Sequence, residues 1–559
     1  MRRSTASCLL AIVALAAVLR LSPLTRFLYF GSDFGEYFRI SQGLVATGHI
    51  FLPYDGWGVS YPYFPGMFFP AAGAAFGGLE VAASLSLYVP ILGAVVVAIV
   101  FLVTGSVFRD DRAALVAAAF LAVAMPHAFF TAHPVPAAVG ELLAAMALLL
   151  YLRLPRDSRT WALLLPVTGA LVVTHHLAVY FLFVMALAAS ALAWLIGARS
   201  PPRAQVTYLA VLSALMIAYW FGYAEAFRAS ILIDVNVSPW WLPFAALPVF
   251  AAGLGVAIFA RRRVSWRYRP RFPNRLNVGL GYGLSFVGLI AVMVEAVVFG
   301  IPGTVIRVSP LTIAYFLPLL AFAAFAGSGR KEADFGRDGL AVSGWLLALL
   351  LSIVIGWVIA PRLLIPFRHI EYVVLVLAIF GGSGFVQVLR PTGRRVVAAG
   401  ALAGLLVAVG AVTAIPPSAI LAGFEEGIRP ATLDAAYWAG MHIDGLLATD
   451  HRASTIAFGF GGVAATWDAA PLALTASDFG AARAEMCAVN APTGISRVDY
   501  VLIDADLANG VQLSPLAPSE PLSPAAAAKF ADAPYHKVFD SGYAQVYFVN
   551  WGLSGGPCP

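Results

Sequence analysis

Charged residues are scarce in this chain. They make up 11% of its 559 residues, whereas 60% are hydrophobic, and the mean hydropathy is +0.84. Soluble globular domains carry about 25% charged residues, so this composition excludes an ordinary soluble protein and predicts a polytopic α-helical membrane protein. Lysine is almost absent, since it occurs only at Lys331, Lys529 and Lys537. The pI near 9.2 therefore comes from arginine in an Ala- and Gly-rich chain, and we expect no nucleic-acid partner.

Signatures of soluble cofactors are missing too. The chain has no Gly-x-x-x-x-Gly-Lys-Ser/Thr loop, no Gly-x-Gly-x-x-Gly after a strand, no Cys-x-x-Cys and no His-Glu-x-x-His. These absences argue against a nucleotide cofactor. Cysteine is limited to Cys8, Cys487 and Cys558. The last two can form a disulfide in an extracytoplasmic compartment, but their spacing does not show whether they meet.

Long apolar stretches recur along the first 414 residues. A stretch of about 20 residues is long enough to cross roughly 30 Å of hydrocarbon. The pattern predicts about 13 transmembrane helices. They are expected near 5–22, 82–104, 112–131, 136–152, 160–174, 176–197, 206–227, 239–260, 276–299, 309–327, 339–360, 369–389 and 396–414.

Arginine-rich loops indicate the orientation in the membrane. Loops rich in Lys and Arg stay in the cytoplasm, and these loops share one side if the N-terminus is cytoplasmic and a large first loop, about 24–81, is external. This parity requires the run Pro65 to Gly78 to lie in the membrane plane, beside an interfacial helix that starts at Asp33. We expect a multi-pass protein of the cell (cytoplasmic) membrane. The basic loops are Arg153–Arg159, Arg199–Arg203, Arg261–Arg275, Arg330–Arg337 and Arg390–Arg395.

Residues 415–559 differ in character from the rest. They carry 6 Lys and Arg against 14 Asp and Glu, which leaves 29 against 15 for residues 1–414. An acidic segment can be exported without penalty, so we expect an extracytoplasmic soluble domain at 415–559 after a transmembrane domain at 1–414. Its pattern predicts a small α/β or α+β domain. The helix is expected at Thr432–Leu447, and strands at Ser454–Phe458, Tyr500–Ile503, Lys537–Phe539 and Ala544–Val549.

Two carboxylates follow the first span, in the heptapeptide Gly31-Ser32-Asp33-Phe34-Gly35-Glu36-Tyr37. An Asp at the centre of a bilayer costs roughly 2.5–3.5 kcal/mol, so a carboxylate pair at the boundary predicts a functional site. Asp33 and Glu36 are the candidate catalytic residues. They are also candidate ligands for a divalent metal, Mg or Mn, although no ligand spacing demands one. Helix capping is the alternative, with Ser32 or Asp33 as the N-cap and Glu36 in a capping box.

The same topology brings further polar residues to the outer side. A carboxylate that takes a proton from an acceptor hydroxyl, with arginines that hold a phosphate, suits transfer from an anionic lipid. The expected substrate-binding residues are Tyr37, His133, Glu141, His175, His176, Arg362 and Arg368.

Most of these residues have a structural explanation as well. His175 and His176 can be interfacial histidines with satisfied hydrogen bonds. Glu141 can pair internally with a neighbouring histidine. Arg362 and Arg368 can extend to ordinary lipid headgroups. Spacing along the chain does not distinguish these roles from substrate binding.

The arrangement resembles the GT-C class of membrane glycosyltransferases, which use polyprenyl-phosphate-linked sugars. That class has a cytoplasmic N-terminus, a first external loop that begins with an essential Asp, and two interfacial helices before the second span. Here Asp33 opens the loop, and Ser60-Tyr61-Pro62-Tyr63-Phe64-Pro65 is similar to the start of the second interfacial helix. The resemblance implies that Asp33 is the base, that Glu36 is a helper or metal ligand, and that Arg368 and Arg362 hold the donor phosphate.

The C-terminal segment resembles the tails of archaeal membrane proteins grouped with that class. The residues concerned are Tyr437-Trp438, Asp450-His451-Arg452 and Val538 to Tyr543. Oligosaccharyltransferase catalytic subunits are the architectural relatives with a named activity. Their Trp-Trp-Asp-Tyr-Gly signature is missing, because Thr466 to Ala470 reads Thr-Trp-Asp-Ala-Ala. Transfer of a whole glycan to Asn is therefore not implied.

The residues and the resemblance together predict an inverting glycosyltransferase. It would move a sugar from a polyprenyl-phosphate donor, such as a dolichyl phosphate, to a lipid, glycan or protein acceptor outside the membrane. A transporter or flippase of a polar or lipid-linked substrate is the alternative. Secondary carriers often contain repeated halves and sites at mid-membrane, whereas this sequence shows no convincing repeat and its charges cluster outside. A third reading is a non-enzymatic assembly or surface-layer partner that acts through the external domain.

Overall fold

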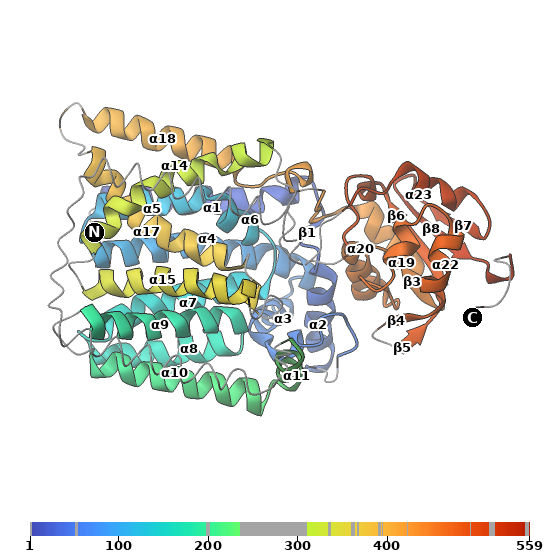
Figure 1. The fold of residues 1–559 in the computed structure, drawn as a ribbon, viewed down its shortest axis with the longest axis horizontal. Coiled ribbons are helices and arrows are strands. Elements are labelled where there is room, and N and C mark those ends of the chain that lie inside the picture. Colours follow the sequence, from blue (N-terminus) through green and yellow to red (C-terminus); the bar gives the residue numbers. More distant parts are fainter. Residues whose placement is uncertain are drawn as a thin grey trace.

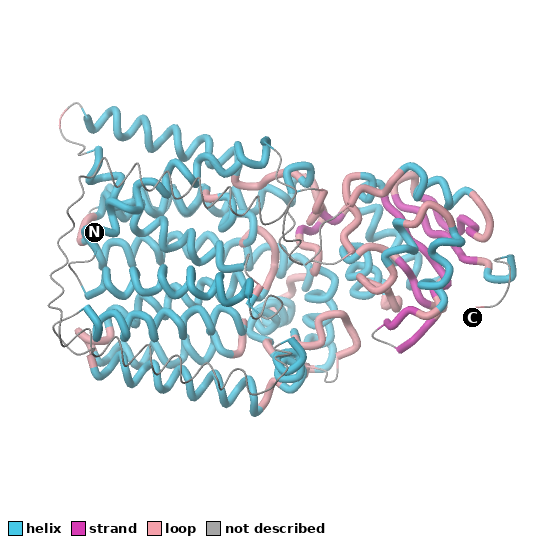
Figure 2. Tube along the Cα trace, viewed as in Figure 1, coloured by secondary structure: helices cyan, strands magenta, loops and turns pink. Residues whose placement is uncertain are grey.

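The protein consists of a long helical bundle followed by a smaller region that contains a β-sheet (Figures 1 and 2). The bundle lies on the left in Figure 1, and the sheet-containing region lies beyond one of its ends. A computed structural model describes residues 3–50, 54–196, 202–234, 310–333, 337–358, 364–365, 368–389, 393, 395–421, 423–491, 494–513, 520–553 and 558. The expected spans at 239–260 and 276–299, and Arg362, lie outside these residues.

The apolar stretches fold as helices close to the positions that their length predicts. Helices α1, α4, α7 and α17 illustrate the agreement, since each begins and ends within four residues of the expected span. The bundle helices are α1 (Arg3–Leu21), α4 (Val81–Phe108), α5 (Asp111–Val123), α6 (Met125–Phe130), α7 (Pro136–Arg153), α8 (Trp161–Val172), α9 (His176–Ile196), α10 (Arg203–Gly222), α14 (Pro310–Ala333), α15 (Arg337–Val358), α17 (His369–Leu389) and α18 (Arg395–Thr413).

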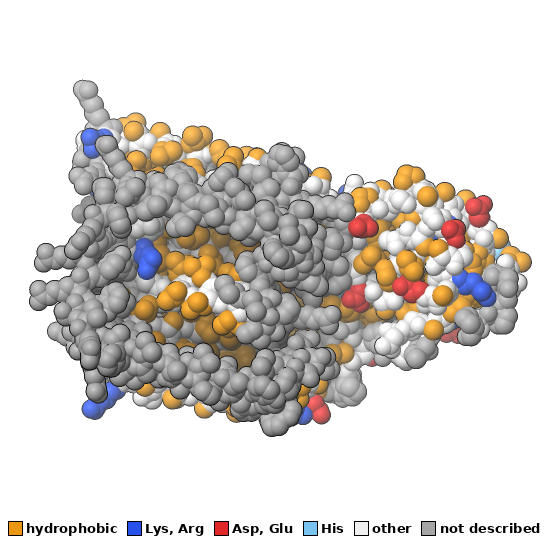
Figure 3. Space-filling view, in the orientation of Figure 1, with side chains coloured by type: hydrophobic (Ala, Val, Ile, Leu, Met, Phe, Trp, Pro, Cys, Tyr) orange, Lys and Arg blue, Asp and Glu red, His pale blue; other side chains and the backbone are white. Residues whose placement is uncertain are grey.

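The bundle presents an apolar surface suited to lipid. Leu10 and Val18 on α1 are 71% and 65% exposed, and Val397 and Val412 on α18 are 76% and 78% exposed. Figure 3 shows hydrophobic side chains over the visible part of the bundle. Within the described residues, six helices are long and apolar enough to cross a membrane: α1, α4, α7, α10, α17 and α18. The protein is therefore a multi-pass membrane protein, and the number of 13 spans stays a prediction.

One expected span is interrupted. The stretch 112–131 was predicted as a single helix, but α5 ends at Val123 and the short helix α6 begins at Met125. Pro126 lies in the first turn of α6. Ala124, between the two helices, has an extended backbone with φ −66° and ψ 113°, and proline in a first turn costs no helical hydrogen bond. The single-span prediction is therefore wrong, and α6 packs beside α17 and α1.

Two short helices follow the first span near the end of the bundle that faces the sheet. Helix α2 (Phe34–Thr47) buries Phe34, Tyr37 and Ile40 on one face. Helix α3 (Phe68–Phe76) packs against α2 and α4. The run Pro65 to Gly78, expected to be an in-plane helix, thus contains α3 after a single 3₁₀ turn at Pro65–Met67. Its orientation relative to the membrane stays a prediction.

The last part of the chain, residues 427–553, is called the sheet region below. Its four-stranded sheet has the order β3-β6-β8-β7, with β3 parallel to β6 and the other two pairs antiparallel. Helices α19 and α22 are visible around it in Figure 1. The elements are β2 (Gly427–Ile428), α19 (Pro430–His442), β3 (Leu446–Ala448), α20 (His451–Ile456), α21 (Pro471–Thr475), α22 (Phe479–Cys487), β4 (Val489–Ala491), β5 (Gly494–Ser496), β6 (Val498–Asp504), α23 (Pro524–Ala528), β7 (Tyr535–Asp540) and β8 (Ala544–Val549).

The predicted strands at Tyr500–Ile503, Lys537–Phe539 and Ala544–Val549 lie within β6, β7 and β8. Two other predictions need correction. The expected helix at Thr432–Leu447 ends at His442, and its last residues enter strand β3. The expected strand at Ser454–Phe458 is helical, because Asp450 caps α20 by accepting a hydrogen bond from the amide of Ala453 at 2.9 Å.

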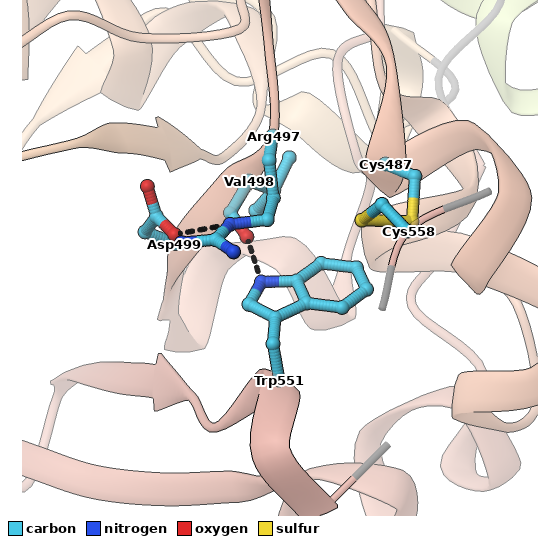
Figure 4. The surroundings of a disulfide bond; sticks show 6 residues. All are labelled: Cys487, Arg497, Val498, Asp499, Trp551 and Cys558. Atoms are coloured by element: carbon cyan, nitrogen blue, oxygen red, sulfur yellow. Dashed lines mark hydrogen bonds and ion pairs between the residues drawn. A yellow bond between two sulfur atoms is a disulfide. The ribbon is translucent and has the colours of Figure 1, made fainter. Parts of the chain in front are cut away.

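Cys487 and Cys558 form a disulfide, with their Cα atoms 5.3 Å apart. Figure 4 shows the bond beside Trp551, whose indole nitrogen donates to the carbonyl oxygen of Val498 at 2.9 Å. Arg497 lies near the same ring and pairs with Asp499 at 2.9 Å. The bond ties α22 to the end of the chain. The sequence alone leaves the pairing of these two cysteines open, and the structure shows that they are bonded.

Candidate active site

The heptapeptide lies where the bundle meets the sheet region. Strand β1 (Tyr29–Phe30) pairs antiparallel with β2, although almost 400 residues separate them. Gly31 then adopts a φ of +130°, a conformation that favours glycine, and its amide donates to the carbonyl of Glu426 at 2.8 Å. Asp33 is thereby placed between the two regions, directly before α2.

Three side chains donate hydrogen bonds to the carboxylate of Asp33. Tyr37 and Tyr61 donate to Oδ2 at 3.0 and 3.1 Å. Nε2 of His451 lies 2.7 Å from Oδ1. Asp33 occupies the N-cap position of α2, but its side chain makes no capping hydrogen bond. The capping explanation therefore does not account for its carboxylate.

Asp33 and His451 form a carboxylate–imidazole pair in a nearly closed environment. The side chain of Asp33 is 14% exposed and that of His451 is fully buried. Burial alone would raise the pKa of Asp33, but the hydrogen bond and charge of His451 outweigh it, and the pKa lies below its ordinary value. Burial likewise disfavours charge on His451, yet Asp33 raises the pKa of this imidazole. Both shifts favour an ionised pair.

Glu36 lies one turn further along α2 and is fully buried. Its carboxylate accepts hydrogen bonds from the Tyr54 hydroxyl at 2.6 Å and the Trp57 amide at 3.2 Å. Burial raises the pKa of Glu36 to about 7 despite these bonds. Glu36 thus connects α2 to Tyr54 and Trp57 of the first loop, and its catalytic role stays a prediction.

The residues around Asp33 do not fit the expected divalent metal. Among the residues that the structure describes, no three His, Cys, Asp or Glu side chains converge as a ligand set. Asp33 and His451 bond each other, and the oxygens of Glu36 are taken by Tyr54 and Trp57. Because Mg²⁺ requires near-octahedral oxygen ligation, we derive no step through a metal.

Arg368 lies directly before α17, near the same centre. Its guanidinium is 3.5 Å from Glu371 and lies over the ring of Phe130 at 5.2 Å from the centroid. Its positive charge lowers the pKa of Tyr61 and Tyr37, although burial raises both overall. Arg368 is therefore close enough to act on the groups that hold Asp33. Arg362, the second expected phosphate ligand, is not among the described residues.

Of the expected histidines, His133 lies nearest to the heptapeptide. It packs edge-on against Phe30 and Phe129, with ring centroids 5.1 and 4.9 Å away. A Cβ on Gly31 would lie 3.1 Å from the Cβ of His133, so the two backbones approach closely. Burial, and then the charge of Arg368, lower the pKa of His133 to about 3. The imidazole of His133 is thus uncharged at neutral pH and packs beside the heptapeptide.

The remaining candidates lie in the bundle, where Glu141 is buried and His175 and His176 are half-buried. Glu141 is fully buried and pairs with Nδ1 of His127 at 3.1 Å, as its internal-pairing alternative predicts. His175 accepts a hydrogen bond from the amide of Ala178 at 3.2 Å. His176 contacts the rings of Phe64 and Phe227, with centroids 5.5 and 4.5 Å away. These contacts are those that the structural explanation expects, and the substrate-binding role of all three stays a prediction.

The sequence did not point to His451 or to Glu426 as site residues. Glu426 is buried, and its carboxylate accepts a hydrogen bond from the amide of Ser32. Burial raises its pKa to about 7. The one available signal was the polar triplet Asp450-His451-Arg452 in an otherwise apolar stretch. Nothing in that triplet indicates which distant segment it contacts.

No protein-family model and no curated protein matches the chain. Several solved structures match the chain. The archaeal oligosaccharyltransferase AglB from Archaeoglobus fulgidus, in complex with an inhibitory peptide and a dolichol-phosphate, aligns with a TM-score of 0.57 and 15% identity over 90% of this chain and 69% of that one. An Archaeoglobus fulgidus oligosaccharyltransferase in complex with Zn and sulfate aligns with a TM-score of 0.57 and 14% identity over 98% of this chain and 73% of that one. ArnT from Cupriavidus metallidurans bound to undecaprenyl phosphate aligns with a TM-score of 0.40 and 14% identity over 98% of this chain and 99% of that one.

The alignment to the oligosaccharyltransferase confirms the resemblance at the level of the fold: this chain has the architecture of a GT-C glycosyltransferase. At 15% identity the match identifies neither substrate nor mechanism. Those depend on the residues around Asp33.

Proposed function

We propose that this protein is an inverting glycosyltransferase that uses a polyprenyl-phosphate-linked sugar and acts on the outer face of the cell membrane. The observation that carries the proposal is the carboxylate of Asp33, which is held by Tyr37, Tyr61 and His451 within a GT-C fold. The matched archaeal oligosaccharyltransferase structure contains a dolichol-phosphate. A lipid-phosphate donor fits an enzyme of this architecture.

In the proposed reaction, Asp33 acts as the general base. Its carboxylate takes the proton of an acceptor hydroxyl while the acceptor oxygen bonds to the anomeric carbon of the sugar. The bond from that carbon to the phosphate oxygen breaks, and the polyprenyl phosphate leaves with the electron pair. A displacement of this kind inverts the anomeric configuration. The low pKa of Asp33 keeps the carboxylate ionised at neutral pH, as a base requires.

Arg368 is the proposed ligand of the donor phosphate. A guanidinium can bind a phosphate with two parallel hydrogen bonds and offset the charge that develops on the leaving group. The Arg368 side chain is 26% exposed. The acceptor is a lipid, a glycan or a protein.

The test is a transfer assay with the purified protein in detergent, a labelled polyprenyl-phosphate sugar and membrane extract as the source of acceptor. We expect label to leave the donor and appear on a new product, with wild-type protein and not with Asp33→Asn. Binding of the donor without any transfer, together with movement of the donor across reconstituted vesicles, would instead support the transporter or flippase alternative.

The proposed orientation makes a separate prediction. In Figure 3 the visible basic side chains of the bundle lie mostly at the end away from the sheet region, and carboxylates lie mostly on that region. Because basic loops stay in the cytoplasm, a cysteine placed at the exposed Ala527 should react with an impermeant reagent in intact cells. A cysteine at the exposed Ser158 should not. Both variants carry Cys8→Ser, so that the native free thiol is absent. The reverse labelling pattern would place Asp33 on the cytoplasmic side.

A further inference from the structure

The bond between Asp33 and His451 joins residues 418 positions apart in the chain. Asp33 belongs to the first loop of the bundle, whereas His451 is the first residue of α20 in the sheet region. We propose that His451 is a positioning residue for Asp33, so that the sheet region completes an active centre that the bundle alone does not form. This inference rests on the proposed function.

The backbone of His451 is fixed from several directions. Its amide donates to the carbonyl of Gln512 at 2.6 Å. The preceding residue, Asp450, caps α20. The following residue, Arg452, donates two hydrogen bonds to Asp504 at 2.7 and 3.0 Å, and both side chains are buried. These hydrogen bonds therefore fix the backbone from which the imidazole of His451 reaches Asp33.

The two helices that carry the pair also approach very closely. A Cβ added to Gly35 of α2 would lie 1.8 Å from the carbonyl oxygen of Thr455 in α20. A Cβ on Gly459, in the short helical segment after α20, would lie 2.2 Å from the carbonyl oxygen of Gly35. Larger residues would separate the helices. Two glycines thus allow the backbone contact that brings His451 within hydrogen-bond distance of Asp33.

The groups that surround the pair come from both regions. Asp33 faces Tyr37 from α2, Tyr61 from the first loop and His451 from α20, and the charges of Glu36, Arg368 and Glu426 also act on this centre. His451 is influenced by Asp450 and Asp468, and its ring contacts Trp57 edge-on at 4.7 Å. His451 is the imidazole that bonds the carboxylate directly. Removing it leaves Tyr37 and Tyr61, which both bond the other oxygen, Oδ2, and would leave Oδ1 without this support.

The experiment compares steady-state transfer by full-length variants with the labelled donor. We expect His451→Ala to lower kcat by up to about 100-fold, because a misplaced catalytic group costs up to this factor, with little change in KM for the donor. His451→Gln should recover much of the loss, since its amide can donate to Asp33 without carrying charge. The unfolding temperature of each variant is measured alongside its kinetics.

Two controls separate positioning from a general loosening of the contact between the regions. Thr455 lies one turn further along α20 and donates to the carbonyl of Ser32 at 2.6 Å, without touching Asp33. Thr455→Val should therefore lower kcat far less than His451→Ala. His536 is exposed on β7, and His536→Ala should behave as wild type.

Three results would overturn the inference: a His451→Ala variant with wild-type kcat, a Thr455→Val variant as slow as His451→Ala, or a His451→Gln variant no faster than His451→Ala. Each leaves the proposed function standing if wild-type protein transfers sugar and Asp33→Asn does not. If wild-type protein itself transfers no sugar, the proposed function fails and this inference with it.

Discussion

Asp33→Asn is expected to lower the single-turnover rate of sugar transfer by about 10²–10⁴-fold, the range that a positioned general base contributes. The amide keeps the size of the side chain and can still accept hydrogen bonds from Tyr37 and Tyr61 through its oxygen. It cannot take a proton. Because the pairing of β1 with β2 and the bond from Thr455 to Ser32 join the two regions without the Asp33 side chain, the variant should remain folded, with an unfolding temperature near that of wild type.

Asp55→Asn is the matched control for this substitution. Asp55 lies in the same first loop, but its side chain is exposed. Removing this charge should leave the transfer rate within about twofold of wild type, as is usual for a surface substitution. If Asp33→Asn transfers sugar as fast as Asp55→Asn, Asp33 is not the base.

Arg368→Lys is expected to weaken donor binding by roughly 10- to 100-fold. A hydrogen bond to a charged group contributes about 1.5–3 kcal/mol, and lysine offers a point charge in place of the planar guanidinium that binds a phosphate through two parallel bonds. An arginine that merely extends to bulk headgroups would tolerate lysine. The measurement is a titration of the labelled donor at constant lipid concentration.

Arg228→Lys provides the comparison for Arg368→Lys. Arg228 lies on α11 (Glu225–Asp234), is 39% exposed and pairs with Glu225 three residues away, as Arg368 pairs with Glu371. The two arginines thus share a local pattern and differ in their distance from the candidate site. Equal donor affinities for wild type and Arg368→Lys would remove Arg368 from the donor site, and equal losses in both variants would indicate an effect that is not specific to Arg368.

Much of the bundle could be predicted from local sequence. A membrane helix satisfies all its backbone hydrogen bonds within one apolar segment, so length and hydropathy suffice to locate α4 and α17. Asp33 could be singled out for a related reason, since a carboxylate beside a span is costly and requires an explanation. The break at Ala124 could not be predicted, because hydropathy does not register the extended backbone of this residue between α5 and α6.

The partner of Asp33 could not be predicted in the same way. Its contact with His451 depends on the pairing of β1 with β2 and on the close approach at Gly35, both of which are long-range features. The strand expected at Ser454–Phe458 illustrates the difficulty. Its residues are compatible with a strand, but the cap at Asp450 and the packing of α20 against α2 favour a helix. Tertiary contacts outweigh local propensity there.

The pairing of the first loop with the sheet region has a consequence for biosynthesis. A ribosome adds about 5–20 residues per second, so the 418 positions between Asp33 and His451 correspond to a delay of roughly 20–80 s. Throughout that interval the nascent chain has its carboxylate in place but lacks the imidazole and strand β2. A chain released early would insert into the membrane without a complete centre. On the proposed function, catalytic competence would therefore appear only after residue 451 has been made and the sheet region has folded against the first loop.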